Sequence, residues 1–316
     1  MMSYKSKQFL WLVLKLLIVI VCGYFIYERI AYNQKINFND FYSILINFDV
    51  FSLKNIVFLL FFSLLNWFLE ITKWRVLARK VQKTSWIEAA KQSLSSLTFS
   101  LVTPNRIGEY GAKALYYSKN QRKEIFALNF IGNFYQLIIT LLTGSIGFVF
   151  LFTNFSKHIP KKNTTVLIFS FILSLILLII SFNKIPFLIN YTSKTAKYLR
   201  SIKKRTHQLV LSISLWRYII FSHQFYFLTL IFDVDISYIN TMACISSMYL
   251  ISSIIPMLSL FDFVIKGSVA LIVFGFFDVS PIIIVSISTL MWILNFAFAA
   301  IIGSYFVLTF RPKTAV

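Results

Sequence analysis

Residues 103–115 read Thr-Pro-Asn-Arg-Ile-Gly-Glu-Tyr-Gly-Ala-Lys-Ala-Leu, and they interrupt an apolar region of the chain. Proline ends or kinks a helix, and glycine permits close approach or unusual backbone dihedrals. Glu109 and Lys113 are four residues apart, so a helix places them on one face, with Arg106 just upstream. Charged residues at membrane depth are costly and usually mark a site lined by protein or water. The stretch therefore predicts a broken helix that lines a polar site.

The composition indicates that a membrane surrounds this site. Of 316 residues, 58% are hydrophobic and 13% are charged, whereas a soluble domain carries about a quarter charged residues. The net charge of +20 would suit nucleic-acid binding, but the basic residues lie between apolar runs and accompany no nucleic-acid motif. The two cysteines lie in apolar runs, where packing is the simpler interpretation. We expect a polytopic membrane protein and no nucleic-acid partner.

The apolar runs predict an all-α membrane helix bundle that forms a single domain over 1–316. A spanning helix needs about 20 predominantly apolar residues. The first run follows Lys5 and Lys7 and lacks a small-residue cleavage pattern, so it is interpreted as a retained helix and not as a signal peptide. Six spanning helices are expected, at 9–27, 55–77, 125–152, 164–182, 208–232 and 280–308.

Two further apolar stretches, 85–118 and 238–277, are each interrupted by a proline and then by charge. We expect each to enter the membrane and return to the same side as a re-entrant helical hairpin. This path leaves most basic residues on the side of the two termini, which the positive-inside rule makes cytoplasmic. It also makes the hairpins enter from opposite faces, and such inverted pairs are typical of transporters. The expected location is a bacterial cytoplasmic (inner) membrane.

The second stretch resembles the first. Pro256 precedes Asp262, and Lys266 follows this acid by four residues. The separation of 153 residues from Glu109 to Asp262 also holds from Lys113 to Lys266, which favours a duplicated unit. Two other interpretations remain: the acid–lysine pairs could be structural ion pairs, or 103–123 could be a solvated loop. Glu70, within 55–77, is expected to face the bundle.

These residues carry a family resemblance. The run Thr103-Pro-Asn-Arg-Ile-Gly-Glu109 is similar to the T-P-G-R-x-G-E element of the flippase-like transmembrane region of lysylphosphatidylglycerol synthases. Asn105 stands where that element has glycine, and the run from Pro256 to Asp262 lacks the family's glycines. The resemblance implies movement of a lipid, or of a lipid-linked molecule, between leaflets. It implies no synthesis here, since the chain stops at Val316, eight residues after the last apolar run.

The leading hypothesis is therefore a lipid flippase-like transporter and not an enzyme. Arg106 and Lys113 are expected to attract an anionic lipid headgroup, while Glu109 and Asp262 hold the cations or bind a cationic group. No catalytic residue, metal or cofactor is expected, since no nucleotide, metal or nucleophile motif occurs. The alternatives are an intramembrane lipid-modifying transferase and a non-catalytic partner of an envelope-polymer enzyme. The expected substrate-binding residues are Pro104, Arg106, Gly108, Glu109, Lys113, Pro256, Asp262 and Lys266.

Overall fold

In a computed structural model of the chain, the helix α3 (Leu53–Ala78) has the reverse of a soluble amphipathic pattern. Its buried face carries the polar residues Ser63, Asn66 and Glu70, whereas Phe61 and Leu64 are exposed. The helix α4 (Trp86–Leu101) likewise buries a face rich in serine and threonine. A helix that turns polar groups inward and apolar groups outward is suited to lipid, where the backbone also needs internal hydrogen bonds.

The structure describes residues 38–101, 103, 106–155, 198, 201–255 and 262–310, and this part of the chain is helical without a β-strand. The all-α prediction is confirmed. Two of the expected spans, 9–27 and 164–182, lie outside the described residues, as do Pro104 and Pro256. Besides α3 and α4, the helices are α2 (Phe38–Asn47), α5 (Ile107–Leu115), the 3₁₀ turn η1 (Lys119–Gln121), α6 (Arg122–Phe155), α9 (Lys204–Ile231), α10 (Tyr238–Ile254), α11 (Asp262–Gly275), α12 (Pro281–Trp292), the π-helix η3 (Ile293–Ala297) and α13 (Phe298–Thr309).

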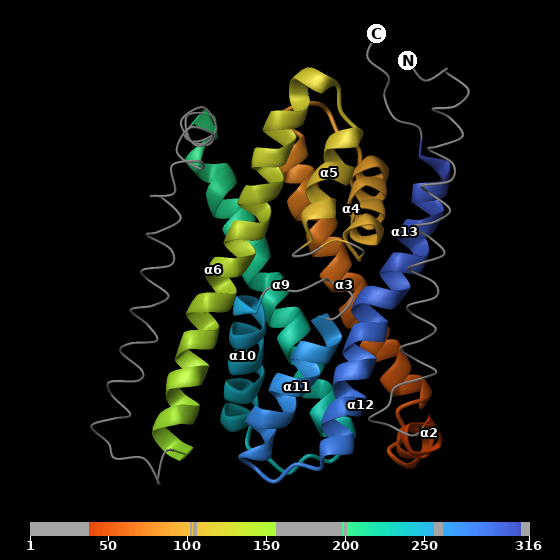
Figure 1. Ribbon diagram of the computed structural model, residues 1–316, viewed down its shortest axis with the longest axis vertical. Coiled ribbons are helices and arrows are strands. Elements are labelled where there is room, and N and C mark those ends of the chain that lie inside the picture. The colour runs from red at the N-terminus through yellow and green to blue at the C-terminus, as the bar shows by residue number, and fades with distance from the viewer. Residues whose placement is uncertain are drawn as a thin grey trace.

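The order of long and short helices occurs twice. The long α3 is followed by the short α4 and α5 and by the long α6; the long α9 is followed by α10, α11 and the long rod α12–η3–α13. Figure 1 shows the α4–α5 hairpin in the upper half of the bundle and the α10–α11 hairpin in the lower half. The long helices of the second set run opposite to those of the first. The hairpins thus approach the middle of the bundle from opposite ends.

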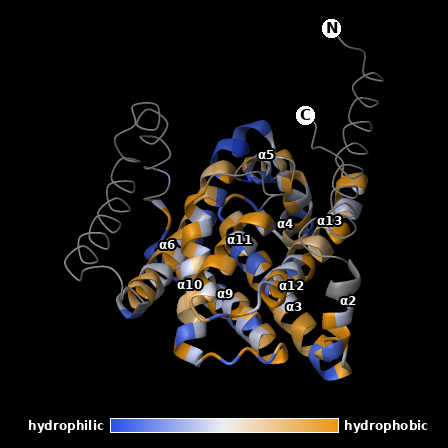
Figure 2. Cartoon of the chain, turned by 60° about the horizontal axis from the view of Figure 1, so that its bottom comes forward, coloured by the Kyte–Doolittle hydropathy of each residue, from blue (hydrophilic) through white to orange (hydrophobic). Residues whose placement is uncertain are grey.

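Three helices among the described residues are long and apolar enough to cross a membrane: Leu53–Ala78, Lys119–Asn154 and Pro281–Thr309. They match three of the predicted spans. The predicted span 208–232 corresponds to α9, which has 28 residues but carries polar ones such as Arg217 and His223 and is not among these three. Figure 2 shows apolar residues along the rods and hydrophilic residues gathered where helices end, as at the turn between α5 and α6. Length and composition agree with a membrane bundle.

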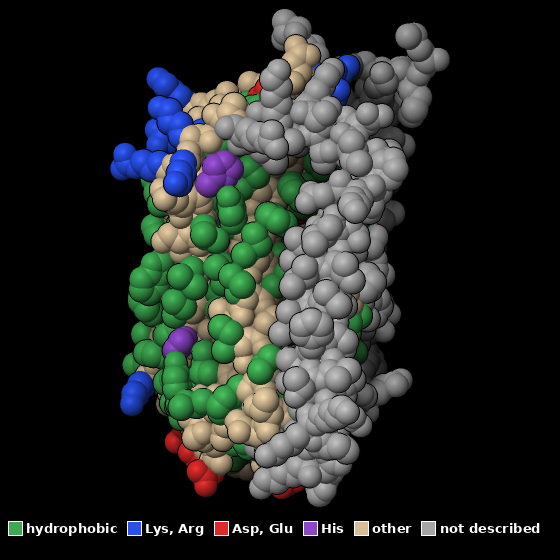
Figure 3. All heavy atoms as spheres, turned by 90° about the vertical axis from the view of Figure 1, so that its left-hand side faces the viewer, with side chains coloured by type: hydrophobic (Ala, Val, Ile, Leu, Met, Phe, Trp, Pro, Cys, Tyr) green, Lys and Arg blue, Asp and Glu red, His purple; other side chains and the backbone are tan. Residues whose placement is uncertain are grey.

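Charge divides the two ends of the bundle. Figure 3 shows most of the visible Lys and Arg at one end, most of the visible acidic side chains at the other, and a band of hydrophobic side chains between them. We name the first the basic end and the second the acidic end. The basic end includes Arg79, Lys80, Lys83, Lys119, Arg122, Lys123, Lys203, Lys204 and Arg205; the acidic end includes Asp49, Asp233, Asp235 and Asp278, with Lys54 beside them.

Each hairpin packs on the last long helix of the other set, which we name its closing rod: α12–η3–α13 for the second set and α6 for the first. Glycine allows the close approach. α4 packs along α13, where a Cβ at Gly303 would collide with the carbonyl oxygen of Leu94. α10 packs along α6, where a Cβ at Gly144 would lie 2.5 Å from the Cβ of Leu250. Small residues that let helix backbones come close are the usual means of helix association in lipid.

We expect Gly303→Ala to destabilise the protein by about 1–3 kcal/mol, the typical cost of overpacking, because the added methyl group meets the backbone of α4. Gly275→Ala is the matched control, since a Cβ there meets nothing within 4 Å. Thermal unfolding of both variants in the same detergent measures the difference. Equal melting temperatures would contradict the close α4–α13 contact.

Candidate functional site

Arg106 lies at the turn that joins α4 to α5. Its φ of 58° is in the left-handed region, which is unfavourable for a residue with a Cβ. The turn is tight, because the backbone N–H of Gly108 donates to Thr103 Oγ1 at 2.8 Å. A Cβ at Gly108 would lie 2.6 Å from the carbonyl oxygen of Phe99. The glycine therefore allows α5 to begin against the end of α4, and this positions Arg106 at the hairpin tip.

Glu109 is the centre of the first charge cluster. Its carboxylate lies 3.1 Å from the Arg106 guanidinium and 2.7 Å from Lys113 Nζ. Lys113 also donates to Asn129 Oδ1 at 2.8 Å, and its Nζ lies 4.3 Å from the centre of the Trp74 ring. The side chains of Glu109 and Lys113 are 2% and 1% exposed, whereas that of Arg106 is 35% exposed. Arg106 is thus the accessible member of the cluster.

The second hairpin carries the corresponding acid–lysine pair, and this pair is more exposed than the first. Lys266 Nζ lies 2.6 Å from Asp262 Oδ2, one helical turn apart at the start of α11. Their side chains are 32% and 29% exposed, and Lys266 also faces the Tyr249 ring at 5.6 Å. Equal sequence spacing has produced equal intrahelical pairs. The two pairs differ in burial: protein encloses the first pair, whereas the second pair is partly exposed.

A third cluster links α3 to α9. Glu70 lies 2.7 Å from Lys73 Nζ on its own helix and 2.5 Å from an Arg217 nitrogen on α9. Glu70 and Lys73 are 6% and 2% exposed, and Arg217 is 15% exposed. The expectation that Glu70 faces the bundle is confirmed. The role of Arg217 was missed, because its partner lies on a helix far away in the sequence.

Amide side chains extend this third cluster to the closing rod. Arg217 Nε donates to Asn66 Oδ1 at 2.9 Å, and Asn66 Nδ2 donates to Asn295 Oδ1 at 2.8 Å. Asn295 Nδ2 in turn donates to Gln224 Oε1 at 2.9 Å. Asn295 lies in the π-helix η3, a wider turn that often occurs at functional sites. The amides therefore connect α3, α9 and the closing rod around one polar centre.

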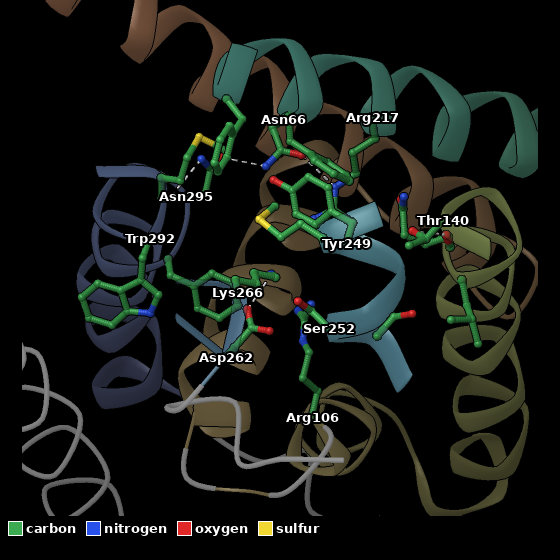
Figure 4. Close-up of a pocket in the computed structure, with 18 of the residues that line it drawn as sticks. Asn66, Arg106, Thr140, Arg217, Tyr249, Ser252, Asp262, Lys266, Trp292 and Asn295 are labelled. Carbon is green, nitrogen blue, oxygen red and sulfur yellow. Dashed lines mark hydrogen bonds and ion pairs between the residues drawn. The ribbon is translucent and has the colours of Figure 1, made fainter. Parts of the chain in front are cut away.

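A cavity of about 400 Å³ lies between the two hairpins and this polar centre. Figure 4 shows Arg106 pointing from the turn before α5 toward Ser252 and Asp262, while Asn66 and Arg217 approach from the other side. Three cations and one acid line the cavity: Arg106, Arg217, Lys266 and Asp262. The remaining lining includes the polar and aromatic residues Tyr110, Gln136, Thr140, Tyr249, Trp292, Asn295 and Phe296, together with the apolar residues Leu137, Met248 and Met291.

The cavity and its supporting clusters carry an excess of positive charge. Five basic side chains (Lys73, Arg106, Lys113, Arg217 and Lys266) pair with three carboxylates, those of Glu70, Glu109 and Asp262. The formal excess is two positive charges. In a low-dielectric bundle such an excess favours an anion. No group of three His, Cys, Asp or Glu side chains that could hold a metal ion occurs in the described ranges.

The eight residues expected at the site fall into three sets. Arg106, Asp262 and Lys266 line the cavity together. Glu109 and Lys113 are buried behind Arg106, and Gly108 shapes the turn, so this geometry does not favour direct contact between Lys113 and a headgroup. Pro104 and Pro256 lie outside the described residues. Asn66, Arg217 and Asn295 line the cavity without having been expected there.

Fold and cavity together define a helical membrane protein with a cation-rich chamber between two opposed hairpins. The family model described as "Lysylphosphatidylglycerol synthase TM region" matches residues 12–304, and the chain belongs to this family. The resemblance drawn from the Thr103–Glu109 run is thereby confirmed. Comparisons with curated proteins and with solved structures found no match.

Glu109 and Asp262 are equivalent by spacing and differ in burial, which makes them a matched pair for a stability test. Glu109→Ala leaves Lys113 buried without its carboxylate, and we expect a loss of about 3–5 kcal/mol. Asp262→Ala breaks a partly exposed pair and should cost about 1 kcal/mol or less. Thermal unfolding in detergent checks the order, and a larger loss for Asp262→Ala would contradict the assignment of burial.

Proposed function

We propose that the protein is a transporter that moves an anionic lipid, or an anionic lipid-linked molecule, between the two leaflets of a membrane. One observation carries this proposal: a cavity lined by Arg106, Arg217 and Lys266 lies at the tips of two opposed hairpins inside an apolar bundle. Arginine suits phosphate because its planar fork can donate two parallel hydrogen bonds. Family membership supports a lipid-related role.

Both hairpins are proposed to be re-entrant. Their arms have 16, 9, 17 and 14 residues, all shorter than the roughly 20 residues that span a bilayer. The basic end of the bundle faces the cytoplasm of a bacterial inner membrane, following the positive-inside rule. Substrates then reach the cavity from either leaflet as the hairpins move, and the acyl chains stay in the lipid.

The residues take different roles in this scheme. Arg106, Arg217 and Lys266 bind the anionic headgroup, and Asp262 orients Lys266 or meets a cationic group on the substrate. Glu109 holds Arg106 at the hairpin tip, as Glu70 holds Arg217. Gly108 shapes the turn between α4 and α5. Pro104 and Pro256 lie outside the described residues and stay proposals based on the sequence. Lys113 lies behind Arg106 and adds positive charge to the site without touching the headgroup, through its ion pair with Glu109.

Reconstitution in liposomes can distinguish transport from two other functions. An intramembrane lipid-modifying transferase would convert the lipid to a product of new mass. A non-catalytic partner of an envelope-polymer enzyme would neither move nor convert it. Purified protein in liposomes with a fluorescent phosphatidylglycerol therefore distinguishes the three by leaflet exchange and by mass spectrometry.

Arg106→Ala should lower the rate of phosphatidylglycerol exchange at least tenfold in these liposomes, because it removes a cation from the cavity. A tenfold change corresponds to about 1.4 kcal/mol. Arg79→Ala is the control, since Arg79 is exposed at the basic end and outside the cavity lining. Equal loss in both variants, or no exchange by the unmodified protein, would overturn the proposal.

The topology has its own test. Cysteines introduced as Ser85→Cys and Asn120→Cys flank the first hairpin, and both sites should react with an impermeant thiol reagent from the cytoplasmic side. The background replaces Cys22 and Cys244 by serine, so that only the new thiols react. Labelling from opposite sides would show that the hairpin crosses the membrane and would rule out re-entry.

A further inference from the structure

Two of the buried carboxylates hold two cations each. Glu70 pairs with Lys73 and with Arg217, at 2.7 and 2.5 Å. Glu109 pairs with Lys113 through Oε1 at 2.7 Å and with Arg106 through Oε2 at 3.1 Å. At Glu70, in contrast, both cations contact Oε2. Each cluster therefore contains one acid, one lysine and one arginine, although the two clusters are built on different helices. Asp262 differs, since Lys266 is the one ion-pair partner found for it in the described part of the chain.

The two cations in each cluster occupy different environments. The arginines line the cavity, with side chains 35% exposed for Arg106 and 15% exposed for Arg217. The lysines that share these carboxylates are buried, with side chains 2% exposed for Lys73 and 1% exposed for Lys113. An anion in the cavity can reach the arginines, whereas the lysines are enclosed by protein.

This division has an electrostatic consequence for ligand binding. When an arginine turns from its carboxylate to an anion, the carboxylate loses a partner. A buried carboxylate left without any counter-charge is strongly unfavourable. Here each acid keeps its lysine, so it stays neutralised while the arginine is engaged elsewhere. The lysine thus lowers the cost of releasing the arginine.

We propose that Lys73 and Lys113 are positioning residues, each of which keeps a buried carboxylate neutralised so that Arg217 and Arg106 can turn to a phosphate-bearing headgroup in the cavity. The inference rests on the proposed function and assigns the anion as a phosphate. Neither lysine touches the ligand. Each lysine acts through the carboxylate that it contacts, Lys73 through Glu70 and Lys113 through Glu109.

Lys73→Met and Lys113→Met should each weaken the binding of a phosphate-bearing lipid by about tenfold, because the carboxylate then keeps its arginine. Binding is measured with phosphatidylglycerol carrying a fluorescent acyl chain, in micelles of neutral detergent. Diacylglycerol with the same label is the uncharged control and should be insensitive to both changes. The melting temperature of each variant without lipid confirms that it is folded.

Rescue separates positioning from a simple loss of charge. Adding Glu70→Gln to Lys73→Met removes the carboxylate that retains Arg217 and should restore binding. Adding Glu109→Gln to Lys73→Met restores the same net charge but leaves Glu70 holding Arg217, so binding should stay weak. The mirrored set is Lys113→Met with Glu109→Gln, which should restore binding, or with Glu70→Gln, which should not.

Equal rescue by either acid change would overturn the proposal, because net charge alone would then govern binding. Unchanged binding in both lysine variants would also overturn it. Arg106→Gln and Arg217→Gln test the proposed function separately: if they too leave binding unchanged, the cavity is not the anion site. Competition by inorganic phosphate as strong as that by unlabelled phosphatidylglycerol would identify a free anion as the ligand; competition by the lipid alone supports a headgroup.

Discussion

A charge inside a membrane is tolerated when other charges or dipoles neutralise it, and the centre of this bundle is organised by that constraint. The carboxylates of Glu70 and Glu109 are almost completely buried, and each is held by cations at ion-pair distance. The Glu70–Arg217 contact also joins two helices that are distant in the sequence. The ion pairs that neutralise these buried charges therefore also orient α3, α5 and α9 around the cavity.

The surrounding helices also turn polar surfaces toward this charged centre. α3 turns polar and charged side chains such as Asn66 and Glu70 inward, whereas large apolar side chains such as Leu64 are exposed. α4 buries a glutamine and a row of serine and threonine side chains. Glycine then brings each hairpin against the closing rod of the other set, as at Gly303 and Gly144. Because the hairpins are short, their tips end in the middle of the bundle. The polar faces of the surrounding helices enclose the cavity there.

The two acid–lysine pairs show how surroundings assign different roles to one pattern. Glu109–Lys113 and Asp262–Lys266 share spacing and ion-pair geometry. Asn129 and Trp74 enclose the first lysine, so Arg106 presents the charge of that cluster to the cavity. The second lysine faces the cavity itself. A lipid headgroup that enters between the tips would meet cations from both hairpins and from α9.

Sequence by itself determined the membrane setting, the helical class, the family and the two interrupted stretches, because hydropathy, proline and charge act locally along the chain. It also located Arg106, Asp262 and Lys266, since isolated charges in apolar runs are conspicuous. Tertiary structure decided which charges meet. The pairing of Glu70 with Arg217 and the amide contacts of Asn66 and Asn295 join segments far apart in sequence, and no local pattern encodes them. Burial of Lys113 behind Arg106 likewise depends on packing against α3 and α6, so only the folded chain distinguishes a cation that lines the cavity from one that supports it.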